Sequence, residues 1–254
     1  MSEVPEADAC RPVVIVPSFN NEAAVAGVVR GALAHDLGVI VVNDGSTDGT
    51  AAAAAEAGAT VIDHPENRGK GAALLTGFSA AASAGYSHAV TIDADGQHYP
   101  SDLPALLARM QARPHAIVVG TRPRDVANVP RSSKIGRAIS DFMLWASSAD
   151  ELQGERPDSQ CGYRIYPLAH VQALRLAARR YDFEQEILVR AAWHRVPIVA
   201  EPIDVHYPPP DERVSHFHKW RDNGRIVRVY TRLMLMRLFW PVFRPRRRLA
   251  PPGA

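Results

Sequence analysis

The sequence predicts an α/β fold in which one mostly parallel sheet is flanked by helices. Short apolar runs alternate with helical segments, which is the pattern of successive βαβ units with right-handed crossovers. With 254 residues, of which 46% are hydrophobic, the chain can bury a substantial core in one large domain. Polar residues also cluster after the expected strands, at the sheet edge where ligands bind in such folds.

Five strands with helices between them are expected in the first half of the chain. Runs rich in β-branched residues predict strands over residues 13–16, 39–42, 60–62, 89–92 and 116–119. Apolar periodicity predicts an alanine-rich helix after residue 50 and further helices over residues 22–34, 69–84 and 102–111. This order is typical of a Rossmann-like sheet.

The second half of the chain is less regular. Helices are expected over residues 131–149 and 181–194, and extended segments over residues 160–166 and 196–205. The run Tyr-Pro-Pro-Pro at residues 207–210 predicts a stiff connector. The expected organisation is a flexible N-terminus (1–11), a folded domain (12–210), a basic amphipathic helical segment (211–243) and a disordered tail (244–254).

The net charge of +2 conceals a strongly basic C-terminal segment. Residues 213–248 contain ten Arg and one Lys against the single acid Asp222, a balance of +10, so the other residues carry −8. Helical spacing places four of these arginines on one stripe between apolar residues: Arg221, Arg225, Arg228 and Arg232. Such a helix is typical of contact with anionic lipids at a membrane interface. A helix packed on the domain with a solvated arginine face is the alternative.

Cysteine content and hydropathy exclude several classes of protein. Two cysteines, Cys10 and Cys161, cannot form a disulfide framework or a cysteine-based zinc site, and Cys161 is expected to be a small buried thiol. The acidic N-terminus lacks the apolar core of a signal peptide, and no run reaches the roughly 18 apolar residues of a membrane span. We therefore expect a cytoplasmic protein that lies peripherally on the inner face of the cell membrane.

Two carboxylates, Asp93 and Asp95, follow the strand expected over residues 89–92. Residues i and i+2 of an extended segment point the same way, so both acids can converge on one ligand. Gly96 frees the backbone beside them, and Gln97 adds a polar side chain. A hard divalent cation held by one or two carboxylates and completed by substrate phosphates has this pattern. A solvated turn is the alternative.

Residues 43–50, Asn-Asp-Gly-Ser-Thr-Asp-Gly-Thr, follow another expected strand. Their position predicts a cradle for a base or a ribose, with Asp44 facing the ligand. The alternative is that Thr47 or Asp48 caps the next helix. The two roles are compatible if Asp44 binds the ligand and Asp48 caps the helix.

Residues 67–71, Asn-Arg-Gly-Lys-Gly, superficially resemble a phosphate loop. The G-x-x-x-x-G-K-[ST] spacing is absent and Ala72 replaces the hydroxyl residue, so a P-loop is disfavoured. A dinucleotide fold is disfavoured too, because no G-x-G-x-x-G motif opens a helix after the first strand. Lys70 is still placed to reach a phosphate, and a solvated helix start is the alternative.

Two later groups keep alternatives open. Glu184 and Glu186 begin an expected helix, where acids favour the macrodipole, but their position also suits acceptor binding. His216 and His218 are separated by one aromatic residue, but no carboxylate or thiol stands at a zinc-ligand spacing. A diphosphate contact by Arg213 and His216 is therefore favoured over zinc.

Taken together, these motifs resemble glycosyltransferase family 2 and, within it, the dolichyl-phosphate mannose synthase-like branch. The resemblance extends over residues 13–207 and rests on four ordered motifs, at residues 17–22, 43–50, 67–71 and 93–98. A looser likeness, at residues 215–217 and 220–223, is to family 2 members found with bacterial aryl-polyene and lipid acyltransferase genes. The resemblance implies a GT-A fold over residues 12–210, a nucleotide-diphosphate sugar donor and Mg²⁺ or Mn²⁺.

The resemblance also implies roles for single residues. Asp93 and Asp95 would bridge the metal to the diphosphate, with Ala94 between them and Gln97 beside the ion. The motifs themselves, rather than the resemblance, predict the phosphate contact of Lys70 and the diphosphate contact of His216. The other implied residues hold the nucleoside or face donor or acceptor phosphates: Pro17, Phe19, Glu22, Val42 and Asp44 for the nucleoside, and Arg122, Arg131 and Arg213 for the phosphates.

The chain departs from the family pattern at two places. Asn43 stands where the family usually has Asp, although Asp44 remains. Residues 213–217 shorten the family's Arg…Gly-Glu-Ser-Lys-Leu run, and His216 replaces its lysine. The second departure alters the expected diphosphate clamp and acceptor pocket.

From these observations we expect inverting sugar transfer to a lipid-linked acceptor, a polyprenyl phosphate or a glycolipid precursor, in cell envelope biogenesis. An anionic membrane surface and a membrane-anchoring partner are expected, whereas the apolar flanks of the arginine stripe argue against nucleic acid. A hydroxyl acceptor is the alternative, and it needs a carboxylate base, for which Asp158, Asp182 and Glu184 are candidates. An inactive nucleotide-binding, membrane-docking module is less favoured because the acidic pair is intact, and a pyrophosphorylase is disfavoured because residues 17–22 form no glycine-rich basic loop.

Overall fold

The computed structural model describes residues 10–123, 131–148, 152, 155, 157–206 and 219–243. Within its last two long helices, the side chains of residues 131–135, 219–223 and 238–243 lie outside the description. The predictions for Arg213, His216, the connector and the C-terminal tail therefore fall outside the described residues, as does the prediction for the side chain of Arg131.

Within the described residues, seven strands form one sheet with the order β3-β2-β1-β4-β6-β5-β7. Their bounds are β1 (Pro12–Ser18), β2 (Gly38–Asn43), β3 (Thr60–Asp63), β4 (His88–Thr91), β5 (Ile117–Thr121), β6 (Arg164–Pro167) and β7 (Ile198–Pro202). Neighbouring strands are parallel, except that β6 runs antiparallel to both β4 and β5. The mostly parallel sheet predicted from the alternating pattern is confirmed.

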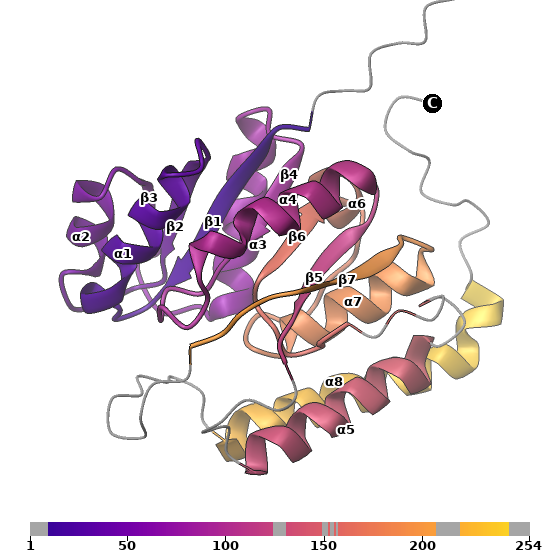
Figure 1. The fold of residues 1–254 in the computed structure, drawn as a ribbon. Coiled ribbons are helices and arrows are strands. Elements are labelled where there is room, and N and C mark those ends of the chain that lie inside the picture. The colour runs from indigo at the N-terminus through magenta and orange to yellow at the C-terminus, as the bar shows by residue number, and fades with distance from the viewer. Residues whose placement is uncertain are drawn as a thin grey trace, which may run out of the picture.

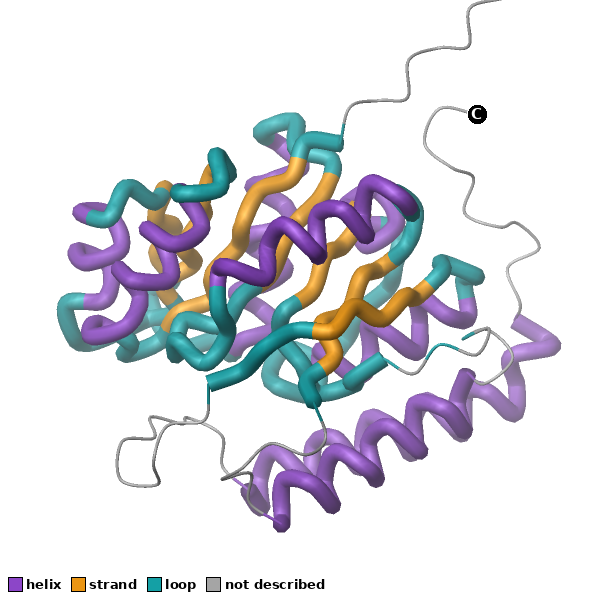
Figure 2. The backbone as a smooth tube through the Cα atoms, in the orientation of Figure 1, coloured by secondary structure: helices purple, strands orange, loops and turns teal. Residues whose placement is uncertain are grey.

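Helices cover both faces of the sheet (Figures 1 and 2). One face carries α1 (Glu22–Leu33), α2 (Thr50–Glu56) and α4 (Leu103–Ala112), the last preceded by a 3₁₀ turn at Pro100–Asp102. The other face carries α3 (Lys70–Ser83), α5 (Arg131–Ser148), α6 (Leu168–Gln172), α7 (Phe183–Trp193) and α8 (Lys219–Phe243). Val13 and Ile15 of β1 enter one core and Val14 and Val16 the other, so the strand is apolar throughout.

Two elements differ from the sequence prediction. The extended segment expected over residues 160–166 contributes only the short β6, because a turn precedes it in which Cys161 N donates to Asp158 O (3.2 Å). Helix α6 follows β6 directly and was not predicted, since its five residues are too few to show an apolar period.

Helices α5 and α8 lie side by side below α7 (Figure 1). Leu144 of α5 and Leu233 of α8 are buried in the common core, and Tyr230 Oη of α8 donates to Ser140 O of α5 (3.0 Å). Helix α8 therefore packs on the domain along one side, as the alternative for this helix predicted. None of the described helices is long and apolar enough to span a bilayer.

The carboxyl ends of the first four strands meet at one edge of the sheet. Ser18 pairs in register with Asn43, and Asn43 with Asp63. Because β6 is antiparallel, its first residue, Arg164, pairs with Thr91 at the end of β4. The loop that precedes β6 therefore reaches the same edge as the loops that follow β1 to β4.

Candidate functional site

The acidic pair follows β4 at this edge. Asp93 and Asp95 are each partly exposed, and Asp95 Oδ1 accepts a hydrogen bond from Gln97 N (3.0 Å), which closes a tight turn at Gly96. Ala94 between the two acids is buried in the core against the α1 and α4 face. The turn thus presents both carboxylates and the Gln97 side chain from one short segment.

The electrostatics of the pair favour a bound cation. Burial, reinforced by the charge of Asp93, raises the pKa of Asp95 to about 6. Burial also opposes ionisation of Asp93, but the Lys70 ammonium outweighs it and holds the pKa of Asp93 below its ordinary value. Two close carboxylates that repel each other are hard oxygen donors of the kind that Mg²⁺ and Mn²⁺ take. The donor set therefore fits a divalent cation.

No third protein ligand stands with the pair in the part of the chain that the structure describes. There, no three His, Cys, Asp or Glu side chains gather in a metal-binding arrangement. A site of two carboxylates leaves most of a six-coordinate ion open for substrate phosphates and water.

Lys70, the first residue of α3, lies at the pair itself. Its Nζ is 2.6 Å from Asp93 Oδ1 and 2.8 Å from Glu184 Oε1 at the start of α7. The side chains of Lys70 and Glu184 are 13% and 8% exposed, against 26% for Asp93. Lys70 was predicted to reach a phosphate; in the structure its partners are two carboxylates from segments far apart in the sequence.

Asp44 holds the loop between β3 and α3. Its Oδ1 lies 2.7 Å from His64 Nδ1 and accepts from Arg68 N (2.9 Å), and its Oδ2 accepts from Gly69 N (2.7 Å). The carboxylate is 4% exposed. The ligand-facing role of Asp44 stays a prediction. Its contacts with the loop were not predicted, although His64 lies in a polar segment at a strand end.

The loops after β1 and β2 are joined at the same edge. Asn20 N donates to Ser46 Oγ (2.9 Å), Thr47 N donates to Asn20 Oδ1 (2.9 Å), and Gly49 N donates to Glu22 Oε2 (3.1 Å). These contacts place Glu22 at the loop predicted to cradle the nucleoside.

The capping residue of α2 differs from the prediction. The N-cap is Gly49, which follows both expected residues, Thr47 and Asp48, because Asp48 Oδ1 accepts from Thr50 N (3.1 Å) in a local turn. The other residues that were expected to hold the nucleoside differ in how far they are buried. Pro17 and Phe19 are partly exposed at the end of β1, whereas the side chain of Val42 is fully buried in the core.

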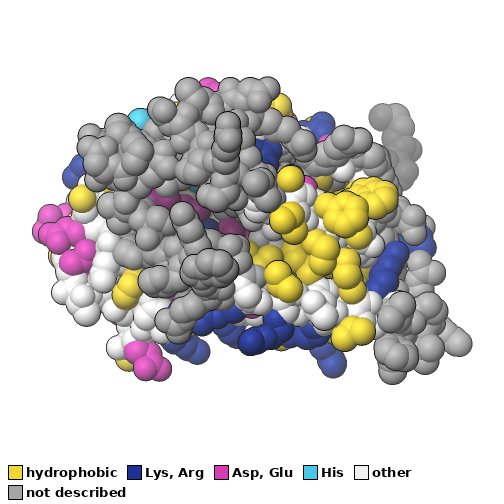
Figure 3. All heavy atoms as spheres, turned by 90° about the horizontal axis from the view of Figure 1, so that it is seen from below, with side chains coloured by type: hydrophobic (Ala, Val, Ile, Leu, Met, Phe, Trp, Pro, Cys, Tyr) yellow, Lys and Arg dark blue, Asp and Glu magenta, His cyan; other side chains and the backbone are white. Residues whose placement is uncertain are grey.

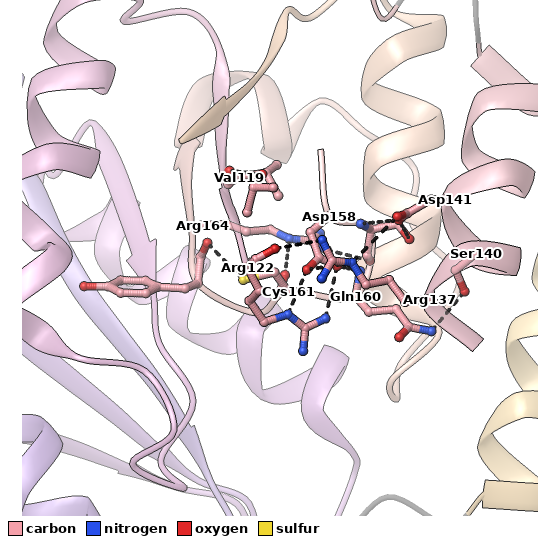
Figure 4. Close-up of polar contacts among 12 residues, drawn as sticks. Val119, Arg122, Arg137, Ser140, Asp141, Asp158, Gln160, Cys161 and Arg164 are labelled. Atoms are coloured by element: carbon pink, nitrogen blue, oxygen red, sulfur yellow. Dashed lines mark hydrogen bonds and ion pairs between the residues drawn. The ribbon is translucent and has the colours of Figure 1, made fainter. Parts of the chain in front are cut away.

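Arg122, directly after β5, belongs to a charged cluster (Figure 4). Its Nε and Nη2 donate to the two oxygens of Asp158 (2.7 and 3.1 Å), and Arg137 Nε of α5 lies 3.3 Å from the same carboxylate. Asp158 is buried, yet the two arginines hold its pKa below its ordinary value. A carboxylate so paired is a poor proton acceptor, so the structure disfavours Asp158 as the candidate general base.

Arg164, which sequence reasoning did not place in the site, is fully buried behind the acidic pair. Its guanidinium donates to Cys161 O (2.6 Å), Ser159 O (2.8 Å) and Glu184 O (2.8 Å). It thereby ties the loop before β6 to the first turn of α7. Cys161 in this loop is the buried thiol expected, and burial raises the pKa of this thiol to about 12, so it is no nucleophile at neutral pH.

The acidic loop also contacts the segment that follows β7. His206 N donates to Gln97 O (2.8 Å), and His98 forms an antiparallel bridge with Val205. The described chain therefore brings residues 205–206 beside the Asp93–Asp95 turn. Arg213 and His216 follow them in sequence.

Comparison with known proteins gives a family and several relatives. The family model described as Glycosyl transferase family 2 matches residues 13–175. The UDP-N-acetylglucosamine–dolichyl-phosphate N-acetylglucosaminyltransferase of Methanococcus voltae is 29% identical over 76% of this chain and 85% of its own length. The polyprenol monophosphomannose synthase of Mycolicibacterium smegmatis is 31% identical over 76% of both chains. The undecaprenyl-phosphate mannosyltransferase of Micrococcus luteus is 31% identical over 76% of this chain and 82% of its own length.

Solved structures share the fold. Glucosyl-3-phosphoglycerate synthase from Mycobacterium tuberculosis, in complex with Mn²⁺, uridine-diphosphate and glucosyl-3-phosphoglycerate, superposes with a TM-score of 0.66 at 20% identity. The match covers 90% of this chain and 80% of that one. A structure of the same synthase with Mg²⁺ and uridine-diphosphate gives a TM-score of 0.66 at 21% identity, over 90% of this chain and 79% of that one.

Proposed function

Because the chain belongs to glycosyltransferase family 2, in its dolichyl-phosphate mannose synthase-like branch, we propose that it moves a sugar from a nucleotide-diphosphate donor to a polyprenyl phosphate. The reaction proceeds with inversion at the anomeric carbon. The observation that carries the proposal is the Asp93–Asp95 pair at the carboxyl end of β4, beside the joined loops of β1 and β2.

Asp93 and Asp95 would hold Mg²⁺ or Mn²⁺, the ions named with uridine-diphosphate in two of the similar structures. The ion would neutralise charge on the leaving diphosphate as a Lewis acid. Glu22, Pro17 and Phe19 would line the nucleoside site beside the loop of residues 43–50. Cationic side chains that the fold already holds in place stabilise the charge that develops in the transition state, and they need not reorganise during the reaction. Arg122, Arg131, Arg213 and His216 are proposed to contact donor or acceptor phosphates in this way.

Two of the three candidate bases are already paired with cations, which supports a phosphate acceptor over a hydroxyl acceptor. A hydroxyl must lose its proton to a base, whereas a polyprenyl phosphate oxygen is already anionic. Of the three candidate bases, Asp158 is bound by two arginines and Glu184 by Lys70. Asp182 accepts a hydrogen bond from Arg180 N (3.1 Å). An acceptor that needs no base agrees with the relatives, whose names include dolichyl phosphate, polyprenol and undecaprenyl phosphate.

The face formed by α5 and α8 supports a peripheral position on an anionic membrane. Five large apolar side chains on these helices are each 55–59% exposed: Ile139, Phe142, Trp145, Val227 and Leu235. Figure 3 shows hydrophobic side chains gathered in one patch on this side of the molecule, with Lys and Arg along its margin. A groove on α8 is lined by Arg228, Arg232 and Leu235, with Thr231 and Met236. Apolar side chains rimmed by arginines suit the boundary between acyl chains and anionic headgroups.

A donor screen followed by an acceptor assay tests the function. UDP-, GDP- and dTDP-sugars are added with Mn²⁺, and the true donor raises the melting temperature with concentration, because it binds only the folded protein. That donor is then offered with a polyprenyl phosphate and with hydroxyl acceptors in separate reactions. Transfer to the hydroxyl acceptors alone would replace the acceptor proposed here. Donor binding without any transfer would favour the inactive binding module.

A further inference from the structure

A chain of three charged side chains links the acidic pair to α7. Lys70 Nζ stands between Asp93 Oδ1, at 2.6 Å, and Glu184 Oε1, at 2.8 Å. The ammonium is largely buried and also lies 5.9 Å from the centre of the Tyr181 ring. Lysine is a compact point charge with three donors, so it can hold two carboxylates at once.

The Asp93 and Lys70 side chains lie directly against the backbone of Gly162. A Cβ at this position would stand 2.6 Å from Asp93 Oδ2 and 2.8 Å from Lys70 Nζ, closer than real Cβ contacts allow. Thr91 Oγ1 fixes the glycine by donating to Gly162 O (2.7 Å). Residue 162 therefore leaves room for the ion pair because it has no side chain.

The segments around these residues are joined by the buried side chain of Arg164. Arg164 donates both to Cys161 O, beside Gly162, and to Glu184 O. One buried guanidinium therefore holds both the loop that contacts the ion pair and the start of α7. If all are ionised, Asp93, Asp95 and Glu184 carry three negative charges and Lys70 one positive charge. The net charge of the four groups is then −2, which a divalent cation neutralises.

We propose that Lys70 is a positioning residue whose ammonium competes with a divalent cation for Asp93, and that Glu184 holds this ammonium when the cation binds. The inference rests on the proposed metal site at Asp93 and Asp95. If Glu184 is removed, Asp93 is the one of these two carboxylates that still binds the Lys70 ammonium. The ammonium then competes more strongly with the divalent cation for Asp93. Lys70 and Glu184 thus set the affinity for the cation with opposite signs.

Mn²⁺ binding to the metal-free full-length protein, without nucleotide, tests this by titration calorimetry. We expect Lys70→Met to strengthen Mn²⁺ binding and Glu184→Gln to weaken it, each by about threefold to tenfold. In the Lys70→Met background, Glu184→Gln should change the affinity little, because Glu184 acts through Lys70. Lys70→Arg, which keeps the charge, should return the affinity toward that of the original protein.

Glu186→Gln is the matched control. Glu186 lies two residues further along α7 and is also buried, but its partners are Arg190 and Arg232. This variant should lose stability without changing Mn²⁺ affinity. If Lys70→Met does not fold without metal, Lys70→Gln, which keeps a donor for Asp93, is titrated instead.

The outcomes separate this inference from the metal site on which it rests. If Asp95→Asn leaves Mn²⁺ binding unchanged, or the original protein binds no Mn²⁺, the metal site itself is wrong. If the original protein binds Mn²⁺ and Asp95→Asn weakens it, but the Lys70 variants bind no more tightly, the role of Lys70 is overturned. An equal loss from Glu184→Gln with and without Lys70 would overturn the role of Glu184.

Discussion

The carboxylate of Glu186 on α7 accepts a hydrogen bond from the guanidinium of Arg232 on α8, with 2.7 Å between Oε1 and Nη2. The same Oε1 accepts from Arg190 Nε (2.7 Å), and Oε2 accepts from Ala177 N (2.9 Å) and Ala178 N (2.6 Å). One buried carboxylate therefore joins a loop, its own helix and α8. Arg232, one of the predicted stripe of arginines, is bound to the domain.

Replacing Glu186 with Gln should lower the free energy of unfolding by about 3 kcal/mol at pH 7, because the arginines lose a buried partner. Burial opposes ionisation of Glu186, but its hydrogen bonds hold the pKa below the ordinary 4.5. A lowered folded-state pKa contributes stability above the unfolded value and loses it as pH falls through the folded value. Urea unfolding should therefore show a difference between the two proteins that is full at pH 7 and shrinks below about pH 4.5. A difference that stays constant with pH would contradict the ionised role of Glu186.

Asp95→Asn should reduce sugar transfer by about 100-fold or more, since it removes a charge proposed to hold the ion under the leaving group. The raised pKa of Asp95 means that the fold disfavours its ionised form. Asn carries no charge, so without metal the variant should melt at the same temperature as the original protein or higher. Steady-state rates with Mn²⁺ and melting curves in chelator measure the two effects. Near-normal transfer by this variant would remove Asp95 from the metal site.

Mn²⁺ binding should weaken as pH falls through about 6, where the raised pKa of Asp95 lets a proton compete with the metal. The direction follows from the charge: the ion needs the carboxylate deprotonated, so affinity is full above this pH and declines below it. Titrations between pH 5 and pH 8, at about constant ionic strength, measure the change. In Asp95→Asn the decline around pH 6 should be absent, which provides the control.

Gly162→Ala should cost about 1 kcal/mol of stability, because the added methyl group meets only the ends of the Asp93 and Lys70 side chains, which must shift. Transfer should fall as well, since Asp93 must move from its present position. Gly27 of α1 is the matched site, because a Cβ there meets nothing within 4 Å. Chemical unfolding and rate measurements on both alanine variants compare them. An active and fully stable Gly162→Ala protein would show that the close approach has no consequence.

Phe142→Glu and Trp145→Glu should each weaken binding to vesicles of anionic phospholipid by about tenfold, because half-exposed rings no longer enter the interface. The two rings lie 5.9 Å apart on α5. Tyr99, an exposed aromatic residue outside α5 and α8, gives the control Tyr99→Glu. Sedimentation with anionic and with zwitterionic vesicles measures the binding. Equal binding of all the variants would remove this face as the membrane contact.

The sequence predicted those parts of the molecule that depend on neighbouring residues. The strands β1 to β5 and the helices between them follow from apolar runs and periodicity, and Asp93 and Asp95 follow a strand end as predicted, although they lie in a turn rather than in an extended segment. Helix α6 escaped prediction because its five residues are too few for a period, and β6 was predicted only as part of a longer extended segment. The antiparallel direction of β6 depends on its place between β4 and β5, which local sequence does not encode.

The partners of the charged residues were not predictable for a different reason. Lys70 meets Glu184, 114 positions away, and Arg122 meets Asp158, 36 positions away. A lone lysine or arginine in a sequence has the same pattern whether its partner is a phosphate or a carboxylate. The close fit at Gly162 is likewise a product of three segments that only the folded chain brings together.

The reversed direction of β6 brings both ends of one long excursion of the chain to the same edge of the sheet. The chain leaves the sheet after Thr121 of β5 and returns at Arg164 of β6, and both points lie at the edge that carries Asp93 and Asp95. Within this excursion, Leu144 is fixed by the core and Gly162 by its close approach to Asp93 and Lys70. Divergence of acceptor choice among relatives should therefore be concentrated in those residues of 122–163 that contact neither the core nor the Asp93–Lys70 pair.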